Sequence, residues 1–379
     1  MIADMKIAPF KTEQFFARYE FNTPHQLCNS DCESLSITEL LSMAGDSLED
    51  FGRQRLSYTE TRGNPELRRS IADTHTNVGP DDVIVLGTPV EGILLAAHVL
   101  LDPGDEVIVL APAYDALTTL FEHVAGQACV KRWSFRPQAN SWALDLDELR
   151  ALISSRTKLL VINFPHNPTG YLPDPSFQES LLNLAEEHGL HVFSDEMYFG
   201  LVQPGTGEIP SAADLSKKSV TLSGLSKTYG LPGLRCGWLI VRDQNLREQI
   251  INWKFYTSIC APAPVEQLSI SAMKVWKTLR DRNIARIGHN LTVADAFFAR
   301  WPDLFTWRRP QAGSTALVAW DTPSVQAISH QLATREGILI QSAHMLGGDD
   351  QHMRVGFGRD NFPEALNKFE DWLKREHKS

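Results

Sequence analysis

Cationic side chains are scarce in this chain of 379 residues: 36 lysines and arginines stand against 46 aspartates and glutamates, a formal net charge of −10. This balance argues against nucleic acid or an anionic membrane surface as the main partner, because both attract basic proteins. No run of about 18 apolar residues is present to cross a bilayer. The first residues also lack the apolar core of a signal peptide. We therefore expect a cytoplasmic protein without a membrane partner.

Cysteine is rare as well, with five scattered residues. Cys28 and Cys32 have the spacing of a metal-binding pair, but no second pair and no histidine cluster completes such a site. Free thiols in a reducing compartment are the better interpretation, and we expect no metal. The chain also lacks a Gly-x-Gly-x-x-Gly sequence after a strand, which disfavours a dinucleotide-binding protein.

The middle of the chain alternates apolar runs with helical stretches. The runs expected as strands are 83–86, 107–110, 159–162, 192–193, 219–222 and 237–241. Helices are expected at 92–101 and 176–188. Continuous apolar strands that alternate with helices are typical of a mostly parallel α/β sheet with helices on both faces. Ligands bind such sheets at the carboxyl ends of the strands.

The two ends of the chain have a different pattern, with helices expected at 284–298 and 362–377 and a strand at 314–320. The length allows two or three domains. We expect an N-terminal segment (1–45) that packs with a small domain, a large domain (46–270), and a smaller α+β C-terminal domain (271–379).

One segment carries most of the chemical information. Residues 223–235 read Ser-Gly-Leu-Ser-Lys-Thr-Tyr-Gly-Leu-Pro-Gly-Leu-Arg. The amine of Lys227 becomes a nucleophile toward carbonyls if burial or a nearby cation lowers its pKa. Arg235 offers a planar fork for a phosphate. An aldehyde that carries a phosphate would use both groups, and pyridoxal 5′-phosphate (PLP) is such a molecule. A lone Ser-Lys pair, in contrast, would indicate only a helix start.

The longer segment resembles the PLP-lysine segment of class I/II aminotransferases, the fold-type I PLP-dependent enzymes. The resemblance extends from about Tyr58 to Arg354, with the motifs in the family's order. It implies a mostly parallel central sheet with a smaller domain beside it, and a homodimer with shared active sites. It also implies that Lys227 holds PLP as a Schiff base and then serves as the general base for the substrate Cα proton.

Three further segments resemble the parts of the family that surround the cofactor ring. In Asn-Phe-Pro-His-Asn-Pro-Thr-Gly (163–170), the resemblance gives Asn167 a bond to the phenolic oxygen and a place beside the substrate. In Ser-Asp-Glu-Met-Tyr (194–198), it places Asp195 at the pyridine nitrogen and Tyr198 at the phenolic oxygen. Tyr114, after another strand, matches the aromatic residue that stacks on the ring. Taken singly, these residues would be a turn, a helix cap and a core aromatic.

Phosphate binding requires more donors than Arg235. Hydroxyls of the lysine segment and main-chain amides at a helix start are candidates: Ser223, Ser226, Thr88, Pro89 and Val90. Since proline has no N–H, one amide donor is missing at Pro89. Tyr58 resembles the tyrosine that reaches the phosphate of the neighbouring subunit.

Arg354 resembles the arginine that binds the substrate carboxylate, whereas Arg359 is expected to be a surface residue. The family often has a glycine near residues 28–40, where this chain has Cys-Asn-Ser-Asp-Cys-Glu (28–33). One interpretation is a helix at 37–44 capped by Ser34 or Ser36. The other is that Ser30, Asp31 or Glu33 contacts the substrate, with an acid binding a cationic side chain such as a guanidinium.

The favoured hypothesis is an aminotransferase that moves the amino group of an α-amino acid to a 2-oxo acid. The alternative is PLP-dependent elimination, replacement or cyclisation, since the chain also has a looser similarity to enzymes of the capreomycidine synthase type, which cyclise hydroxylated arginine. A non-catalytic sensor is disfavoured because the catalytic set is complete and no DNA-binding domain has room.

Overall fold

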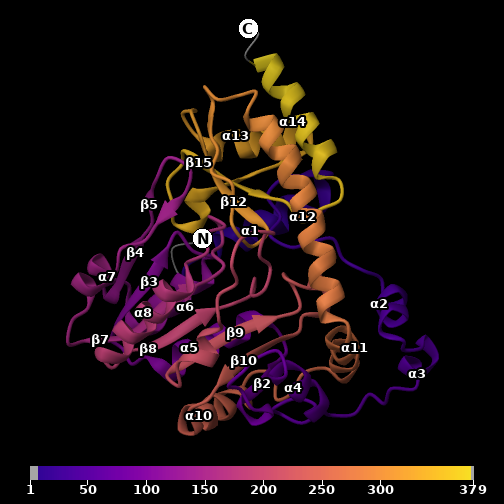
Figure 1. The fold of residues 1–379 in the computed structure, drawn as a ribbon, viewed down its shortest axis with the longest axis vertical. Helices are drawn as coiled ribbons and strands as arrows, with labels where there is room; N and C mark the ends of the chain where they lie inside the picture. The colour runs from indigo at the N-terminus through magenta and orange to yellow at the C-terminus, as the bar shows by residue number, and fades with distance from the viewer. Residues whose placement is uncertain (1–6, 377–379) are drawn as a thin grey trace.

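The computed structural model describes residues 7–376, and its larger part is a seven-stranded sheet in the order β2-β10-β9-β8-β7-β3-β4 (Figure 1). The strands are β2 (Val83–Leu86), β3 (Glu106–Ala111), β4 (Val130–Ser134), β7 (Thr157–Asn163), β8 (His191–Asp195), β9 (Ser219–Gly224) and β10 (Gly237–Val241). Neighbouring strands are parallel, except that β10 runs antiparallel to β2 and β9. The prediction of a mostly parallel α/β sheet is confirmed.

Helices cover both faces of the sheet, because its strands are apolar on both sides. One face is covered by α5 (Pro89–Leu100), α6 (Ala116–Ala125) and α10 (Gln244–Lys254). The other is covered by α7 (Leu146–Leu152), α8 (Pro175–Glu187), α2 (Ile37–Ala44), α4 (Pro65–Ala72) and α11 (Ala263–Lys274). The short elements α3 (Leu48–Gly52), α9 (Ala212–Leu215), β5 (Arg136–Pro137) and β6 (Trp142–Ala143) complete this part.

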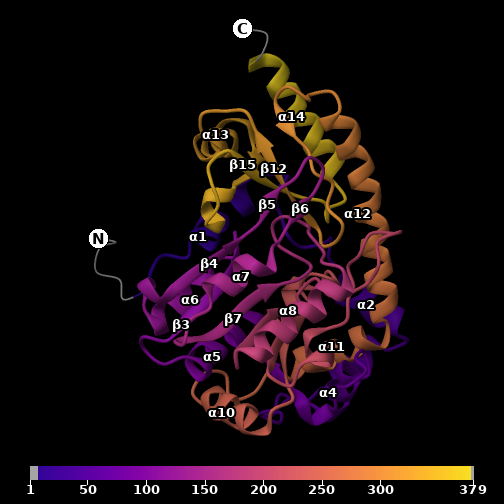
Figure 2. The same cartoon turned by 60° about the vertical axis from the view of Figure 1, so that its left-hand side comes forward.

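The smaller part is built on an antiparallel sheet in the order β11-β12-β15-β14. Its strands are β11 (Phe305–Thr306), β12 (Thr315–Trp320), β14 (Gln341–Ser342) and β15 (His352–Gly356). Its helices are α12 (Trp276–Phe298), α13 (Val325–Gln331) and α14 (Phe362–Glu376). The long α12 runs from the large part into the small one in both views (Figures 1 and 2). The division of the chain at residues 45 and 270 stays a prediction.

The N-terminal segment lies against the small part. After α1 (Lys11–Tyr19), β1 (His25–Gln26) pairs with β13 (Ile338–Leu339). Residues 27–33 then pass directly over two glycines that follow Arg354. A Cβ at Gly356 would lie 1.7 Å from the carbonyl oxygen of Asn29, and one at Gly358 would lie 2.1 Å from that of Asp31. These glycines therefore allow residues 27–33 (the N-terminal strap) to reach the carboxyl end of the large sheet.

Two features were searched for among the described residues. None of the helices within residues 7–376 combines the length and the apolarity needed to cross a bilayer. The same residues contain no cluster of histidine, cysteine and carboxylate side chains that could bind a metal. All five cysteines are free, and Cys28 and Cys32 are buried in the strap.

Candidate active site

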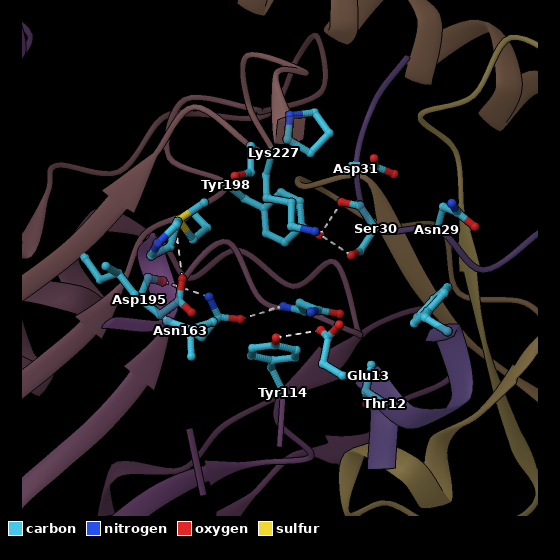
Figure 3. A pocket seen from close by; sticks show the side chains of 18 of the residues that line it. Thr12, Glu13, Asn29, Ser30, Asp31, Tyr114, Asn163, Asp195, Tyr198 and Lys227 are labelled. Atoms are coloured by element: carbon cyan, nitrogen blue, oxygen red, sulfur yellow. Dashed lines mark hydrogen bonds between the residues drawn. The ribbon is translucent and has the colours of Figure 1, made fainter. Parts of the chain in front are cut away.

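A cavity of about 440 Å³ lies at the carboxyl ends of β3, β7, β8 and β9, beneath the N-terminal strap and β15. Its volume is in the range of small-molecule sites, roughly 300–1,000 Å³. Most residues predicted from the sequence line it: Ser30, Asp31, Pro89, Val90, Tyr114, Asn167, Asp195, Tyr198, Ser226, Lys227, Arg235 and Arg354. The structure therefore brings together, from elements far apart in the sequence, the groups that the motifs singled out (Figure 3).

Lys227 lies in the turn that follows β9, and its Nζ donates a hydrogen bond of 2.8 Å to Oγ of Ser30. Removal from water lowers the pKa of this amine below its ordinary value. The charge of Asp31 opposes this shift, whereas the charge of Arg354 adds to it. A larger share of the amine is consequently uncharged near neutral pH, which is the form that attacks a carbonyl or accepts a proton.

Asp195 ends β8, in register with Asn163 at the end of β7. The Asn163 amide joins the two segments: it donates to the Asp195 carbonyl oxygen at 2.7 Å and accepts the Asn167 backbone N–H at 2.8 Å. This pair of bonds sets the turn that carries Asn167. Sequence reasoning missed Asn163 as a cavity residue, although it opens the same motif.

Tyr198 contacts the same residue of the strap as Lys227. Its hydroxyl donates a 2.7 Å hydrogen bond to the Ser30 carbonyl oxygen, which also accepts a 2.7 Å bond from Oγ of Ser314. Ser30 thus meets the tyrosine through its backbone and the lysine through its side chain. The arrangement places a hydroxyl donor and the lysine amine beside each other in the cavity.

The opposite end of the cavity has the groups expected for a phosphate. Arg235 has a left-handed backbone (φ 52°), and its Nη2 donates to Oγ1 of Thr88, the N-cap of α5, at 2.9 Å. Oγ of Ser226 is buried and has no hydrogen-bond partner within the described part of the chain. An orphaned hydroxyl, a guanidinium and a helix start favour an anion here. This end of the cavity fits the phosphate of PLP.

Arg354, on β15, is only 1% exposed. Its Nε and Nη2 donate to the Cys28 carbonyl oxygen at 3.1 and 2.8 Å, and its Nη1 lies 3.4 Å from Oδ1 of Asn167. The ring of Phe16 lies 5.8 Å from its Cζ atom. These contacts hold the guanidinium at the edge of the cavity.

Four predicted residues do not line the cavity. Ser223 is excluded because side chains alternate along β9 and its neighbour Leu222 faces the cavity; the Ser223 hydroxyl instead donates to the Glu196 carbonyl oxygen at 3.2 Å. Thr88 contributes only through its bond to Arg235. Tyr58 is 86% exposed on the surface. Glu33 borders a separate surface pocket with Arg359.

Arg359 is not the ordinary surface residue that was expected. Its guanidinium is mostly enclosed and pairs with Asp31 at 2.9 Å and Glu33 at 3.8 Å. The helix interpretation of this segment is confirmed too: Ser36 caps α2 and forms a capping box with Glu39. Asp31 lines the cavity in the same structure in which Ser36 caps α2. The helix cap and a contact between Asp31 and the substrate are therefore compatible.

Helix α1 contributes a wall of the cavity that sequence reasoning missed. Its residues Thr12, Glu13 and Phe16 line the cavity, followed by Glu20. Thr12 donates to the Asp115 carboxylate through both its backbone N–H (3.1 Å) and its hydroxyl (2.5 Å). The spacing 13-16-20 is the only signal in the sequence, because it puts these side chains on one helix face.

The buried Asp195 makes the stability of the cofactor-free protein depend on pH. Burial raises the pKa of its carboxyl from 3.8 to about 6, against a stabilising bond from the Met197 amide. The Asp195 carboxyl binds its proton more tightly in the folded protein than in the unfolded chain, and this tighter binding stabilises the fold fully at pH values below the pKa of the unfolded chain. The contribution is lost as pH rises through the folded pKa of about 6. This shift in pKa corresponds to a contribution of roughly 3 kcal/mol to the free energy of unfolding. We expect Asp195→Asn to flatten the pH dependence of the unfolding free energy over about pH 4–6, measured by urea denaturation.

The matched control is Asp174→Asn, which changes an exposed aspartate at the start of α8. This variant should keep the pH dependence of the parent protein. An Asp195→Asn protein with an unchanged slope would contradict the burial argument.

Similarity to known proteins agrees with this geometry. The sequence model of the family described as aminotransferase class I and II matches residues 26–366. Capreomycidine synthase of Streptomyces vinaceus is 32% identical over 298 residues, which cover 78% of this chain and 75% of that protein. A probable aspartate aminotransferase of Methanocaldococcus jannaschii is 28% identical over 266 residues, 65% of this chain and 68% of that one.

Among solved structures, that of a PLP-dependent aminotransferase from Streptococcus suis has a TM-score of 0.90 at 28% identity, covering 98% of this chain and 99% of that one. The region matched by the family includes every predicted cavity residue from Ser30 to Arg354.

Proposed function

The chain belongs to the aminotransferase class I and II family of PLP-dependent enzymes, and we propose that it moves the amino group of an α-amino acid to a 2-oxo acid through Lys227. The observation that carries this proposal is the position of the Lys227 amine, which lies in the cavity against Ser30 of the N-terminal strap and has a lowered pKa because it is partly removed from water. An amine of lowered pKa in a cavity suits both attachment of an aldehyde and transfer of a proton.

The cavity residues divide into three roles. Arg235, Ser226 and the start of α5 would hold the PLP phosphate, while Asp195 would face the pyridine nitrogen and Tyr114 the ring. When bound, PLP supplies an electron sink for the bond that breaks at the substrate Cα. Asn167 and Tyr198 would hold the phenolic oxygen, since both present polar side-chain atoms to the cavity.

The remaining groups act on the substrate. Arg354 would bind its carboxylate, which fixes the orientation of the Cα–H bond. The Lys227 amine would accept the Cα proton and hold it for return within the cavity. The Ser30 hydroxyl, 2.8 Å from Nζ, orients the amine for this transfer. The cofactor and these cavity residues are common to several PLP reactions.

The second candidate is elimination, replacement or cyclisation of a substituted amino acid such as hydroxylated arginine. The similarity to capreomycidine synthase at 32% identity favours it. In this reaction Lys227 would take the same proton, but a β- or γ-substituent would leave instead of the amino group.

One experiment separates the two. The PLP-bound protein is mixed with a panel of amino acids that includes arginine and hydroxylated arginine, and its absorption spectrum and products are followed. Transamination predicts bleaching to the pyridoxamine form and one 2-oxo acid. Elimination or cyclisation predicts a spectrum that returns to its start and a product lighter by its leaving group. Absence of any spectral response would contradict both candidates.

A homodimer would give Tyr58 a function that it cannot have within one chain. Tyr58 lies outside the cavity and, with Leu56 and Tyr256, is more than four-fifths exposed. Exposed apolar side chains of this size are typical of interfaces. We expect two chains per particle in sedimentation, and a roughly tenfold weaker PLP affinity in Tyr58→Phe, because one phosphate bond is lost. A monomer at micromolar concentration, or an unchanged PLP affinity, would contradict this assignment.

A further inference from the structure

Three carboxylates that PLP does not require lie along one wall of the cavity. Glu13 belongs to α1 and Glu20 to the turn that follows it, while Asp31 belongs to the N-terminal strap. Seven residues separate Glu13 from Glu20, which is two helical turns. Figure 3 shows Glu13 and Asp31 on one side of Lys227 and Asp195 on the other. In the proposed function the cofactor ring lies beside Asp195, so this wall would border the part of the cavity that is left for substrate.

The three acids differ in what already contacts them. Glu13 accepts a 2.8 Å hydrogen bond from the Tyr114 hydroxyl, and Asp31 pairs with Arg359. Within residues 7–376, the Glu20 carboxylate accepts one long contact of 3.5 Å, from Nδ2 of Asn29. Removal from water raises the pKa of Glu20, and the charges of Asp31 and Glu13 add to this effect, while those of Arg359 and Lys227 oppose it. Glu20 is thus a half-buried carboxylate that is short of donors within the described residues.

Asn29 provides a second, independent sign of a missing donor. It is 4% exposed, lines the cavity, and has an Oδ1 with no partner in residues 7–376. The orientation of the Asn29 amide is set by its nitrogen atom, because Nδ2 donates to Oε1 of Gln26 at 2.7 Å and faces Oε1 of Glu20. A buried acceptor without a donor is costly, so a ligand that supplies one would be favoured.

The cations within the cavity have other tasks in the proposed function. Lys227 serves the aldehyde, Arg235 the phosphate and Arg354 the substrate carboxylate. A substrate group can therefore supply the donors that Glu20 and Asn29 lack within residues 7–376. A guanidinium carries a full positive charge and five N–H donors in one plane, which suits several acceptors on one wall.

We propose that Glu20 and Asn29, flanked by Glu13 and Asp31, bind a cationic group at the end of the substrate side chain, with a guanidinium preferred. This inference rests on the proposed function, because it takes Arg354 and Lys227 as occupied at the other end of the same substrate. It also excludes aspartate and glutamate as good substrates, since their side-chain carboxylates would meet three like charges.

The test uses the PLP-bound enzyme with L-arginine and L-citrulline, which have the same length and shape but differ in charge. Dissociation constants come from calorimetry and spectral titration, independently of turnover. We expect arginine to bind about tenfold more tightly or better, and Glu20→Gln to remove most of this preference. Glu13→Gln, which keeps an acceptor for Tyr114, should weaken the preference partially. The matched control is Glu33→Gln, the same change on the strap outside the cavity, and it should keep the preference.

The outcomes distinguish this inference from the proposed function. Equal binding of arginine and citrulline, or faster reaction of aspartate or alanine than of arginine, overturns the cation site while the PLP reaction stands. A protein whose spectrum responds to no amino acid overturns the proposed function itself. Unchanged PLP absorption and melting temperature in Glu20→Gln establish that the variant is folded.

Discussion

Replacement of Lys227 by alanine is expected to remove the visible absorption of lysine-bound PLP and to lower the reaction rate by about 10⁴-fold or more, because one amine performs both attachment and proton transfer. Its environment supports this double use: loss of water lowers its pKa, and Ser30 holds Nζ at 2.8 Å. The spectrum of the purified variant and single-turnover rates with its best amino acid measure the two losses separately.

Two variants control this result. Lys227→Arg keeps the positive charge but lacks the primary amine, so it should lose as much as the alanine variant. Lys217→Ala removes an exposed lysine ten residues away and should behave like the parent protein. A Lys227→Ala protein that retains the visible band would contradict the assignment of the cofactor lysine.

Replacement of Arg354 by lysine is expected to lower kcat/KM for every α-amino acid by about 10²–10³-fold, because a lysine cannot form the two parallel bonds that a guanidinium makes to a carboxylate. Lysine keeps the positive charge in a position that is 1% exposed, which limits damage to the fold. Steady-state kinetics with a series of amino acids, together with the PLP spectrum, measure the effect.

Arg359→Lys is the matched control, since Arg359 lies five residues later, pairs with Asp31 and does not line the cavity. Its kcat/KM should change by less than about tenfold, as expected for a partly exposed ion pair. Similar losses in both variants, or a loss of PLP binding in Arg354→Lys, would contradict the carboxylate role.

The sequence predicted the central sheet well because its strands are continuous apolar runs. The ranges 83–86 and 237–241 coincide with β2 and β10. Strand β4 was not predicted, since it is an edge strand in which only Trp133 is buried. Helix α12 begins at Trp276 rather than at 284, because charged residues conceal the apolar period in its first turns and its N-cap makes no side-chain bond.

Cavity residues were predictable where they belong to a sequence motif. They were not predictable where only the folding of distant segments brings them into the cavity. Lys227, Asp195 and Asn167 lie in segments whose residue types suit one cofactor. Glu13 and Glu20 carry no such signal, since they become cavity residues only when α1 packs beside Tyr114 and β15. The opposite error occurred in the lysine segment, where two serines three residues apart were both assigned to phosphate. The strand ends between them, so Ser226 faces the cavity and Ser223 does not.

The most direct test of the account is the site of PLP attachment. The purified PLP-bound protein is treated with borohydride, which makes the lysine linkage permanent, and then digested and analysed by mass spectrometry. We predict one modified peptide, with the phosphopyridoxyl mass on Lys227. Modification of another lysine, such as the buried Lys254, or of several surface lysines would contradict the central claim that Lys227 holds the cofactor.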